Sequence, residues 1–128
     1  RVGCAALDKF YKIQIDRPAD LVIATPGGYP KDINLYQAQK ALDNARHAVR
    51  PGGIIILAGA CSEGFGEAVF EEWLQEAAKP RDLIERVKSE FRLGGHKAVA
   101  IAMTLQDASV YFVSDMPPEE AAATFMKP

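Results

Sequence analysis

The chain has 128 residues, of which 48% are hydrophobic and 25% are charged; this composition is typical of one globular domain and excludes a disordered segment. The formal net charge is −2 and no basic stripe is visible, so nucleic-acid binding has no electrostatic basis. The longest apolar runs, such as residues 54–60, are too short to span a bilayer, and no signal peptide is recognised.

Two strands are predicted near the start of the chain. Over residues 11–15 apolar and polar side chains alternate, which indicates a strand with one wet face, placed at a sheet edge. Residues 21–24 form a continuous apolar run, which predicts a strand buried on both faces. The prolines and glycines of residues 26–30 end that strand.

An amphipathic helix follows, and it is the clearest element of the sequence. Its start is indicated by Asp32, or by Asn34 with Gln37 three residues later, which is a pair typical of a capping box. Residues 50–53, Arg-Pro-Gly-Gly, indicate its end. Its apolar stripe consists of Leu35, Ala38, Leu42, Ala45 and Val49.

A second apolar strand is predicted over residues 54–58, and together with the helix it completes a right-handed βαβ unit with parallel strands. Residues 59–66 form a glycine-rich loop. A helical face with Phe70 and Trp73 comes next, and Pro80 opens a further helix. The inner side of that further helix is expected to carry Ile84, Val87 and Phe91.

The rest of the chain continues the alternation of helices and strands. Alanine and methionine favour a helix over residues 97–106, and residues 110–113 read as a third buried strand. A last helix is expected to begin at Pro117 and to be cut off at Pro128. We therefore predict a single α/β domain over residues 1–128, a Rossmann-like three-layer sandwich with a mostly parallel sheet flanked by helices.

Open parallel sheets bind ligands beyond the carboxyl ends of their strands. Here those segments are residues 25–32, 59–66 and 114–117. Gly27 and Gly28 in the first segment could bring backbone N–H groups and a helix N-terminus close to an anionic ligand, or could simply turn the chain.

Three side chains at the start of the long helix share one patch. Tyr36, Gln37 and Lys40 lie away from the apolar stripe and offer an aromatic ring, an amide and an ammonium. This set suits a planar, anionic ligand, although an ordinary solvated helix face has the same spacing.

The stretch from Asp20 to Leu42, with the signature GGYPKDINLYQAQKAL, resembles the C-terminal lobe of the nickel-dependent lactate racemase family. The segments PGGIIILAGACSEGFG and FRLGGHKA are similar to that lobe as well, and the resemblance covers about Asp20 to Ser114. It implies a two-lobe enzyme that racemises a small 2-hydroxy acid through transient hydride removal to a nickel-pincer nucleotide. It also implies that the tethering lysine, a histidine ligand of nickel and the acid–base histidine pair lie on the first lobe.

The resemblance assigns roles to three positions of this chain. Tyr36 matches an aromatic residue near the cofactor, and Gln37 and Lys40 match residues that face the substrate. Because the chain opens at Arg1 within sequence that already resembles a structured region, we expect a fragment whose partner is the missing N-terminal lobe. The fragment itself is expected to be inactive, with no catalytic residue, no metal and no cofactor of its own.

Other candidates carry weaker signals. His96 could border the cleft or be an ordinary packed or solvated histidine, and His47 reads as a surface residue. Cys61 and Glu63 could join a histidine in a metal site, but no ligand spacing supports one. Cys4 and Cys61 read as two reduced thiols, as expected for a cytoplasmic protein that binds neither nucleic acid nor membrane.

Two alternative functions stay open at this point. Residues 49–53, followed by an apolar strand, resemble a segment of Rossmann-like S-adenosylmethionine- or nucleotide-binding domains, but residues 25–30 lack the G-x-G-x-x-G loop of that class. A non-catalytic docking domain would expose an apolar patch and would not depend on Tyr36, Gln37 or Lys40.

Overall fold

The computed structural model describes residue 7 and residues 10–128 of the chain. Its strands are β1 (Ala19–Ala24), β2 (Val49–Ala58) and β3 (Ser109–Val113), and they form one parallel sheet in the order β1-β2-β3. Its helices are α2 (Leu35–Ala45), α3 (Ala68–Glu76), α4 (Pro80–Ser89), α5 (Gly95–Asp107) and α6 (Pro118–Ala122). The predicted α/β class, a parallel sheet flanked by helices, is confirmed.

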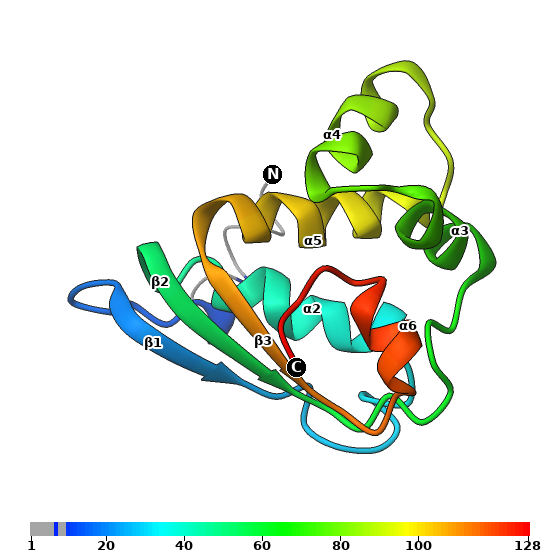
Figure 1. Cartoon of the computed structure of the whole chain (residues 1–128). Coiled ribbons are helices and arrows are strands. Elements are labelled where there is room, and N and C mark those ends of the chain that lie inside the picture. Colours follow the sequence, from blue (N-terminus) through cyan, green and yellow to red (C-terminus); the bar gives the residue numbers. More distant parts are fainter. Residues whose placement is uncertain (1–6, 8–9) are drawn as a thin grey trace.

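The helices form successive layers on one face of the sheet (Figure 1). Helix α2 contacts β1 and β2, and α5 contacts β2 and β3. Helices α3 and α4 pack in turn against α5. The core lies between the sheet and the first helix layer and is fully buried. It includes Ile55 and Leu57 of β2, together with Leu42 of α2 and Ile101 of α5.

The opposite face of the sheet remains apolar and open. Leu21 pairs laterally with Ile54, and Ile23 pairs with Ile56, so their side chains share that face. Ile23 is 66% exposed, and Val113 at the end of β3 is 58% exposed. The prediction that β1 is buried on both faces is therefore wrong, because β1 is an edge strand and helices cover it from one side.

The predicted strand over residues 11–15 is also wrong. Phe10 and Tyr11 end a helical turn, and residues 12–15 have no regular structure. Ile13 is 86% exposed, so the alternation of apolar side chains does not mark a buried face here.

Helix α2 begins as predicted but ends earlier. Asn34 caps it, since its Oδ1 accepts a hydrogen bond from the Gln37 backbone N at 3.1 Å. Asp32 instead accepts from the backbone N of Ala60 at 3.2 Å. Val49 belongs to β2, which runs on through the glycines that were expected to end the helix. A Cβ at Gly53 would lie 2.9 Å from the Asp20 carbonyl oxygen, so this glycine lets the two strands approach closely.

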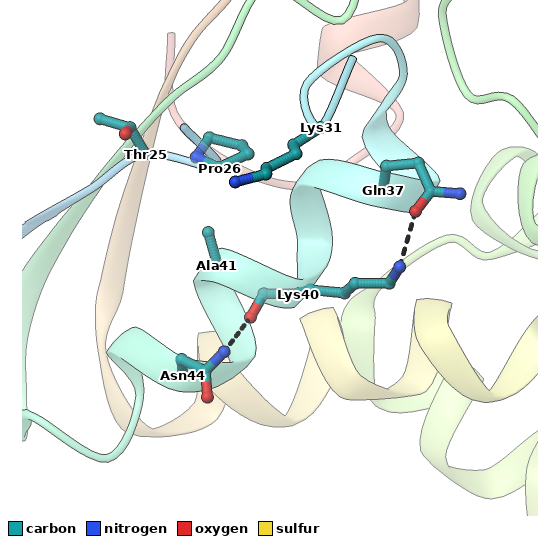
Figure 2. Close-up of a pocket in the computed structure, with 7 residues that line it drawn as sticks. All are labelled: Thr25, Pro26, Lys31, Gln37, Lys40, Ala41 and Asn44. Carbon is teal, nitrogen blue, oxygen red and sulfur yellow. Dashed lines mark hydrogen bonds between the residues drawn. The ribbon is translucent and has the colours of Figure 1, made fainter. Parts of the chain in front are cut away.

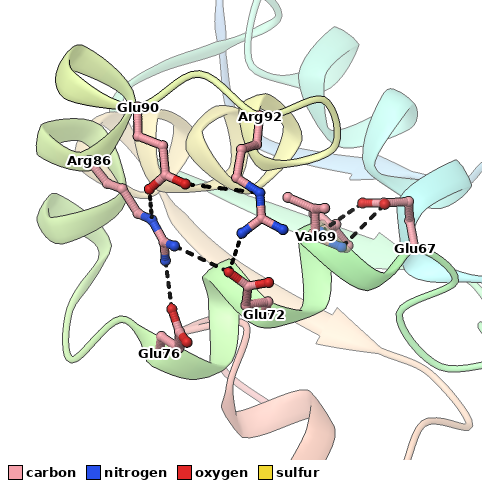
Figure 3. A network of polar contacts seen from close by, with 8 residues as sticks. Glu67, Val69, Glu72, Glu76, Arg86, Glu90 and Arg92 are labelled. Carbon is pink, nitrogen blue, oxygen red and sulfur yellow. Dashed lines mark hydrogen bonds and ion pairs between the residues drawn. The ribbon is translucent and has the colours of Figure 1, made fainter.

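Helices α3, α4 and α5 lie where the sequence predicts them, with one correction. Phe91 follows the end of α4 and is 73% exposed, while Leu83 is the buried residue of that helix. Ion pairs join α3 to α4 and to the segment after it (Figure 3). The network consists of Arg86 with Glu72, Glu76 and Glu90, and of Arg92 with Glu72 and Glu90.

The last segment of the chain does not continue as a helix to Pro128. Helix α6 ends at Ala122, and the chain then returns to lie beside β3. The backbone N of Lys127 donates to the Val110 carbonyl at 2.9 Å, and Phe112 N donates to the Lys127 carbonyl at 2.7 Å. The last helix is therefore shorter than predicted, because the residues near the end of the chain pair with β3. Within the described ranges, every helix is too short or too polar to cross a membrane.

Candidate functional site

A pocket lies between the segment that follows β1 and helix α2 (Figure 2). Its volume is about 370 Å³. Thr25 and Pro26 follow directly after β1, so the pocket lies beyond the carboxyl end of a parallel strand. The lining residues are Thr25, Pro26, Lys31, Gln37, Lys40, Ala41 and Asn44.

The polar groups of this pocket are cationic or neutral. Lys40 Nζ donates a hydrogen bond to Gln37 Oε1 at 2.6 Å, and Asn44 Nδ2 donates to the Lys40 carbonyl at 2.9 Å. Lys31 adds a second ammonium, and no carboxylate is among the lining residues. The arrangement therefore suits a small anion with hydrogen-bond acceptors.

The two glycines before the pocket shape a turn. Gly27 and Gly28 have φ angles of 97° and 74°, which glycine adopts without strain. The Lys31 backbone N donates to the Gly28 carbonyl at 2.8 Å, and the Lys31 side chain lies over Gly27. This turn explains why Lys31 reaches the pocket.

The first backbone N–H groups of α2 are already occupied. Leu35 N donates to the Gly64 carbonyl at 2.9 Å, and Tyr36 N donates to the Phe65 carbonyl at 3.0 Å. The next donor, Gln37 N, bonds to Asn34. These N–H groups are therefore not free to bind an anion, and the positive charge of the site comes from side chains.

Tyr36 lies on the neighbouring face of α2 and does not line the pocket. Its ring packs edge to face against Phe70, with ring centroids 5.7 Å apart. Lys97 of α5 places its Nζ 3.6 Å from the centroid of the Tyr36 ring. The structure thus brings Gln37 and Lys40 together in the pocket and places Tyr36 beside them, partly buried.

Sequence reasoning missed four residues of this region. Lys31 stands within the family signature, and Asn44 follows Lys40 by four residues on the same helix, so both had a local signal. Thr25 follows the predicted strand directly. Lys97 stands within the similar segment FRLGGHKA, but its contact with Tyr36 had no local signal, because it forms only through the packing of α5 beside α2.

Glu63 and His96 do not line the pocket. Glu63 is exposed in the glycine-rich loop, and its backbone N donates a hydrogen bond to the Ile33 carbonyl at 2.9 Å. The exposed His96 accepts a hydrogen bond at Nδ1 from the Gly94 backbone N at 3.3 Å, and its ring stacks on Phe91. Both are surface residues: Glu63 lies in the loop before α3, and His96 lies in the first turn of α5.

Cys61 is fully buried, and burial, followed by the charges of Asp32 and Asp115, raises the pKa of its thiol to about 12. A thiol of this kind stays protonated and is a poor nucleophile and metal ligand. Cys4 lies outside the described residues. Across residue 7 and residues 10–128, histidine, cysteine and acidic side chains form no group of three or more that could hold a metal ion.

Comparison with known proteins identifies relatives of this chain. A family described as "Lactate racemase C-terminal domain" matches residues 14–126. The lactate racemase of Thermoanaerobacterium thermosaccharolyticum is 36% identical over 90 residues, which cover 70% of this chain and 21% of that protein. The lactate racemase of Lactiplantibacillus plantarum is 31% identical over 121 residues, which cover 91% of this chain and 28% of that protein.

A solved structure has the same fold. The lactate racemase apoprotein from Thermoanaerobacterium thermosaccharolyticum matches with a TM-score of 0.82 and 33% sequence identity, over 88% of this chain and 28% of that chain. The present chain therefore spans about a quarter of the length of the proteins that it matches.

Proposed function

Because this chain belongs to the lactate racemase C-terminal domain family, we propose that it is the C-terminal lobe of a two-lobe 2-hydroxy acid racemase or epimerase. Its role is to form the wall of an interlobe cleft that faces substrate and cofactor. The observation that carries this proposal is the pocket that Gln37, Lys40 and Lys31 line without a carboxylate.

The substrate would be held by its carboxylate. Lys40 uses one of its three N–H donors on Gln37, which leaves two for an incoming anion. The Gln37 amide nitrogen points away from that bond and is a further donor (Figure 2). Two neighbouring donors of this kind orient a carboxylate, so that the carbinol carbon of a 2-hydroxy acid takes a defined position.

The residues in and beside the pocket also fit the nickel-pincer nucleotide that the family implies. They would contact the nucleotide without binding its metal. The nucleotide is a planar, phosphate-bearing group, and Tyr36, Lys40 and Lys31 offer an aromatic ring and two cations in one region. When bound to the full-length enzyme, it supplies the acceptor for the hydride of the substrate. Metal ligation, the covalent tether and acid–base chemistry are assigned to the other lobe.

The proposal includes the N-terminal lobe of a longer chain as the partner. Parallel sheets are usually covered on both faces, and here Leu21, Ile23 and Val113 are exposed on one of them. The additional length of the relatives provides material that could cover this face. We accordingly expect the isolated chain, a cytoplasmic protein with a buried reduced thiol, neither to racemise lactate nor to retain nickel.

Kinetics of a full-length polypeptide that carries this lobe test the proposal. Lys40→Ala removes a charge-assisted hydrogen bond worth about 1.5–3 kcal/mol, so we expect kcat/KM for lactate or another 2-hydroxy acid to fall by about 10- to 100-fold. Lys79→Ala is the matched control, since Lys79 is an exposed lysine at the start of α4. Wild-type kinetics in the Lys40 variant would remove this residue from the site.

The S-adenosylmethionine-binding alternative gains no support from the fold. Residues 25–34 separate β1 from α2, and the first N–H groups of α2 are bonded to the loop at residues 64–65. No glycine-rich turn therefore leads directly from β1 to α2, as the phosphate-binding loop of that class requires. Calorimetry with S-adenosylmethionine is expected to show no binding.

A further inference from the structure

Lys97 links helix α5 to the start of helix α2. Its Nζ donates a hydrogen bond to the Tyr36 carbonyl at 2.6 Å and also lies 3.6 Å from the centroid of the Tyr36 ring. The same lysine therefore holds both the backbone and the side chain of Tyr36. The Tyr36 ring also packs edge to face against Phe70, whose ring centroid is 5.7 Å away.

The charge of Lys97 is not neutralised by a neighbouring acid. Among the described residues, no carboxylate oxygen lies within 4.0 Å of the ammonium of Lys97 or of Lys40. Glu67 lies close to Gly94 at the start of α5, but its carboxylate is occupied as the N-cap of α3. It accepts hydrogen bonds there from the backbone N of Val69 and of Phe70.

The two ammonium groups also influence one another. Burial lowers the pKa of Lys97, and the charge of Lys40 lowers it further. Lys97 is partly buried, and placing an unpaired cation in such a position beside another cation is unfavourable. A bound anion that approaches both groups would remove this cost.

Resting on the function proposed above, we propose that Lys97 is the positioning residue of Tyr36 and a further cation of the anion site formed with Lys40. The ligand group is an oxyanion, either the carboxylate of the substrate or a phosphate of the cofactor. Tyr36 would present its ring to the planar part of that ligand, in an orientation that Lys97 sets through the carbonyl and the ring face.

Anion binding to the chain can be measured by NMR without cofactor or turnover. Sodium phosphate and sodium lactate are titrated separately, with sodium chloride at equal ionic strength as the reference, while the signals of Tyr36, Gln37 and Lys97 are followed. We expect saturable shifts at these residues, and the anion that binds more tightly identifies phosphate or carboxylate as the ligand group. Shifts that match those of chloride would overturn the anion site.

Substitutions separate charge from structure. Lys97→Met keeps much of the side-chain length but removes the charge, and we expect it to weaken anion binding by about tenfold and to move the Tyr36 ring signals even without anion. Lys97→Arg keeps the charge and can lie on the ring, so it should restore binding to within about threefold. Lys79→Met controls for the loss of an exposed lysine on α4.

The outcomes distinguish this inference from the proposed function. Unchanged Tyr36 signals and unchanged anion affinity in Lys97→Met would overturn the inference, whereas the Lys40 kinetics of the full-length enzyme would still stand. If Lys97→Met behaves as expected but the full-length enzyme racemises no 2-hydroxy acid, the proposed function fails and the anion site remains. Should Lys97→Met unfold, the comparison of Lys97→Arg with wild type decides, and loss of anion binding in the folded arginine variant contradicts the proposal.

Discussion

The buried thiol of Cys61 lies in a loop that borders α2, yet its environment makes it unreactive. Burial raises its pKa to about 12, with Asp32 and Asp115 adding to the effect, so the thiolate population at neutral pH is very small. In a Cys4→Ser background at pH 7.5, we expect a disulfide reagent to label the folded chain at least about 100-fold more slowly than the chain unfolded in guanidinium chloride. Equal labelling rates would show that the thiol is accessible and ionised.

A single glycine supports the cap of α2. Gly66 has a φ of 81°, and a Cβ there would lie 2.1 Å from Cγ of Asn34, the capping residue. Gly66→Ala therefore strains the backbone and displaces the cap, and we expect urea unfolding to show a loss of about 2 kcal/mol. Gly28→Ala is the matched control, because Gly28 has a φ of 74° with no atom within 4 Å of the added Cβ, and its loss should be about 1 kcal/mol. Equal losses in the two variants would contradict this account of the cap.

At the scale of elements, the ion pairs of α3 and α4 predict a dependence on pH. Hydrogen bonding from Arg92, followed by the charges of Arg92 and Arg86, lowers the pKa of Glu72. A carboxylate with a lowered pKa in the folded state stabilises that state above its usual pKa, and this contribution is lost as the pH falls through the lowered value. We expect Glu72→Gln to reduce the fall in Tm between pH 6 and pH 3, by a small amount because the pair is exposed to solvent. A pH profile of Tm identical to that of wild type would show that the network contributes nothing measurable.

The elements that sequence reasoning predicted correctly are those with local signals. Helix α2 has a capping residue at Asn34 and a regular apolar stripe, and the central strand is a continuous apolar run. The errors concern pairing between distant segments. Within the described part of the chain, the alternation over residues 11–15 has no neighbouring strand, and Lys127 joins β3 by hydrogen bonds across the fold. Likewise, the patch on α2 could be predicted from its spacing, whereas the contact of Lys97 with Tyr36 could not, because it joins residues that are 61 positions apart in the chain.

At the scale of the whole molecule, helices cover one face of the sheet (Figure 1). Apolar side chains are exposed on the other face. We expect the chain at high concentration to self-associate and to bind a hydrophobic dye through this face. Ile23→Lys with Val113→Lys should reduce both effects with little loss of stability, since these side chains are already 66% and 58% exposed. Val110→Lys on the covered face is the contrasting control and should prevent folding, because Val110 is 1% exposed. Light scattering that shows a monomer before and after the double substitution would argue against an open docking face.

The measurement that tests the central claim most directly is racemisation by a hybrid enzyme. This chain would replace the matching C-terminal part of the lactate racemase from Thermoanaerobacterium thermosaccharolyticum, which is 36% identical over 90 residues. A folded, cofactor-loaded hybrid is predicted to interconvert the enantiomers of at least one small 2-hydroxy acid, and Lys40→Ala should reduce that turnover by about tenfold or more. A folded hybrid that racemises none of these acids, or one in which Lys40→Ala changes nothing, would contradict the assignment of this lobe to the active-site cleft.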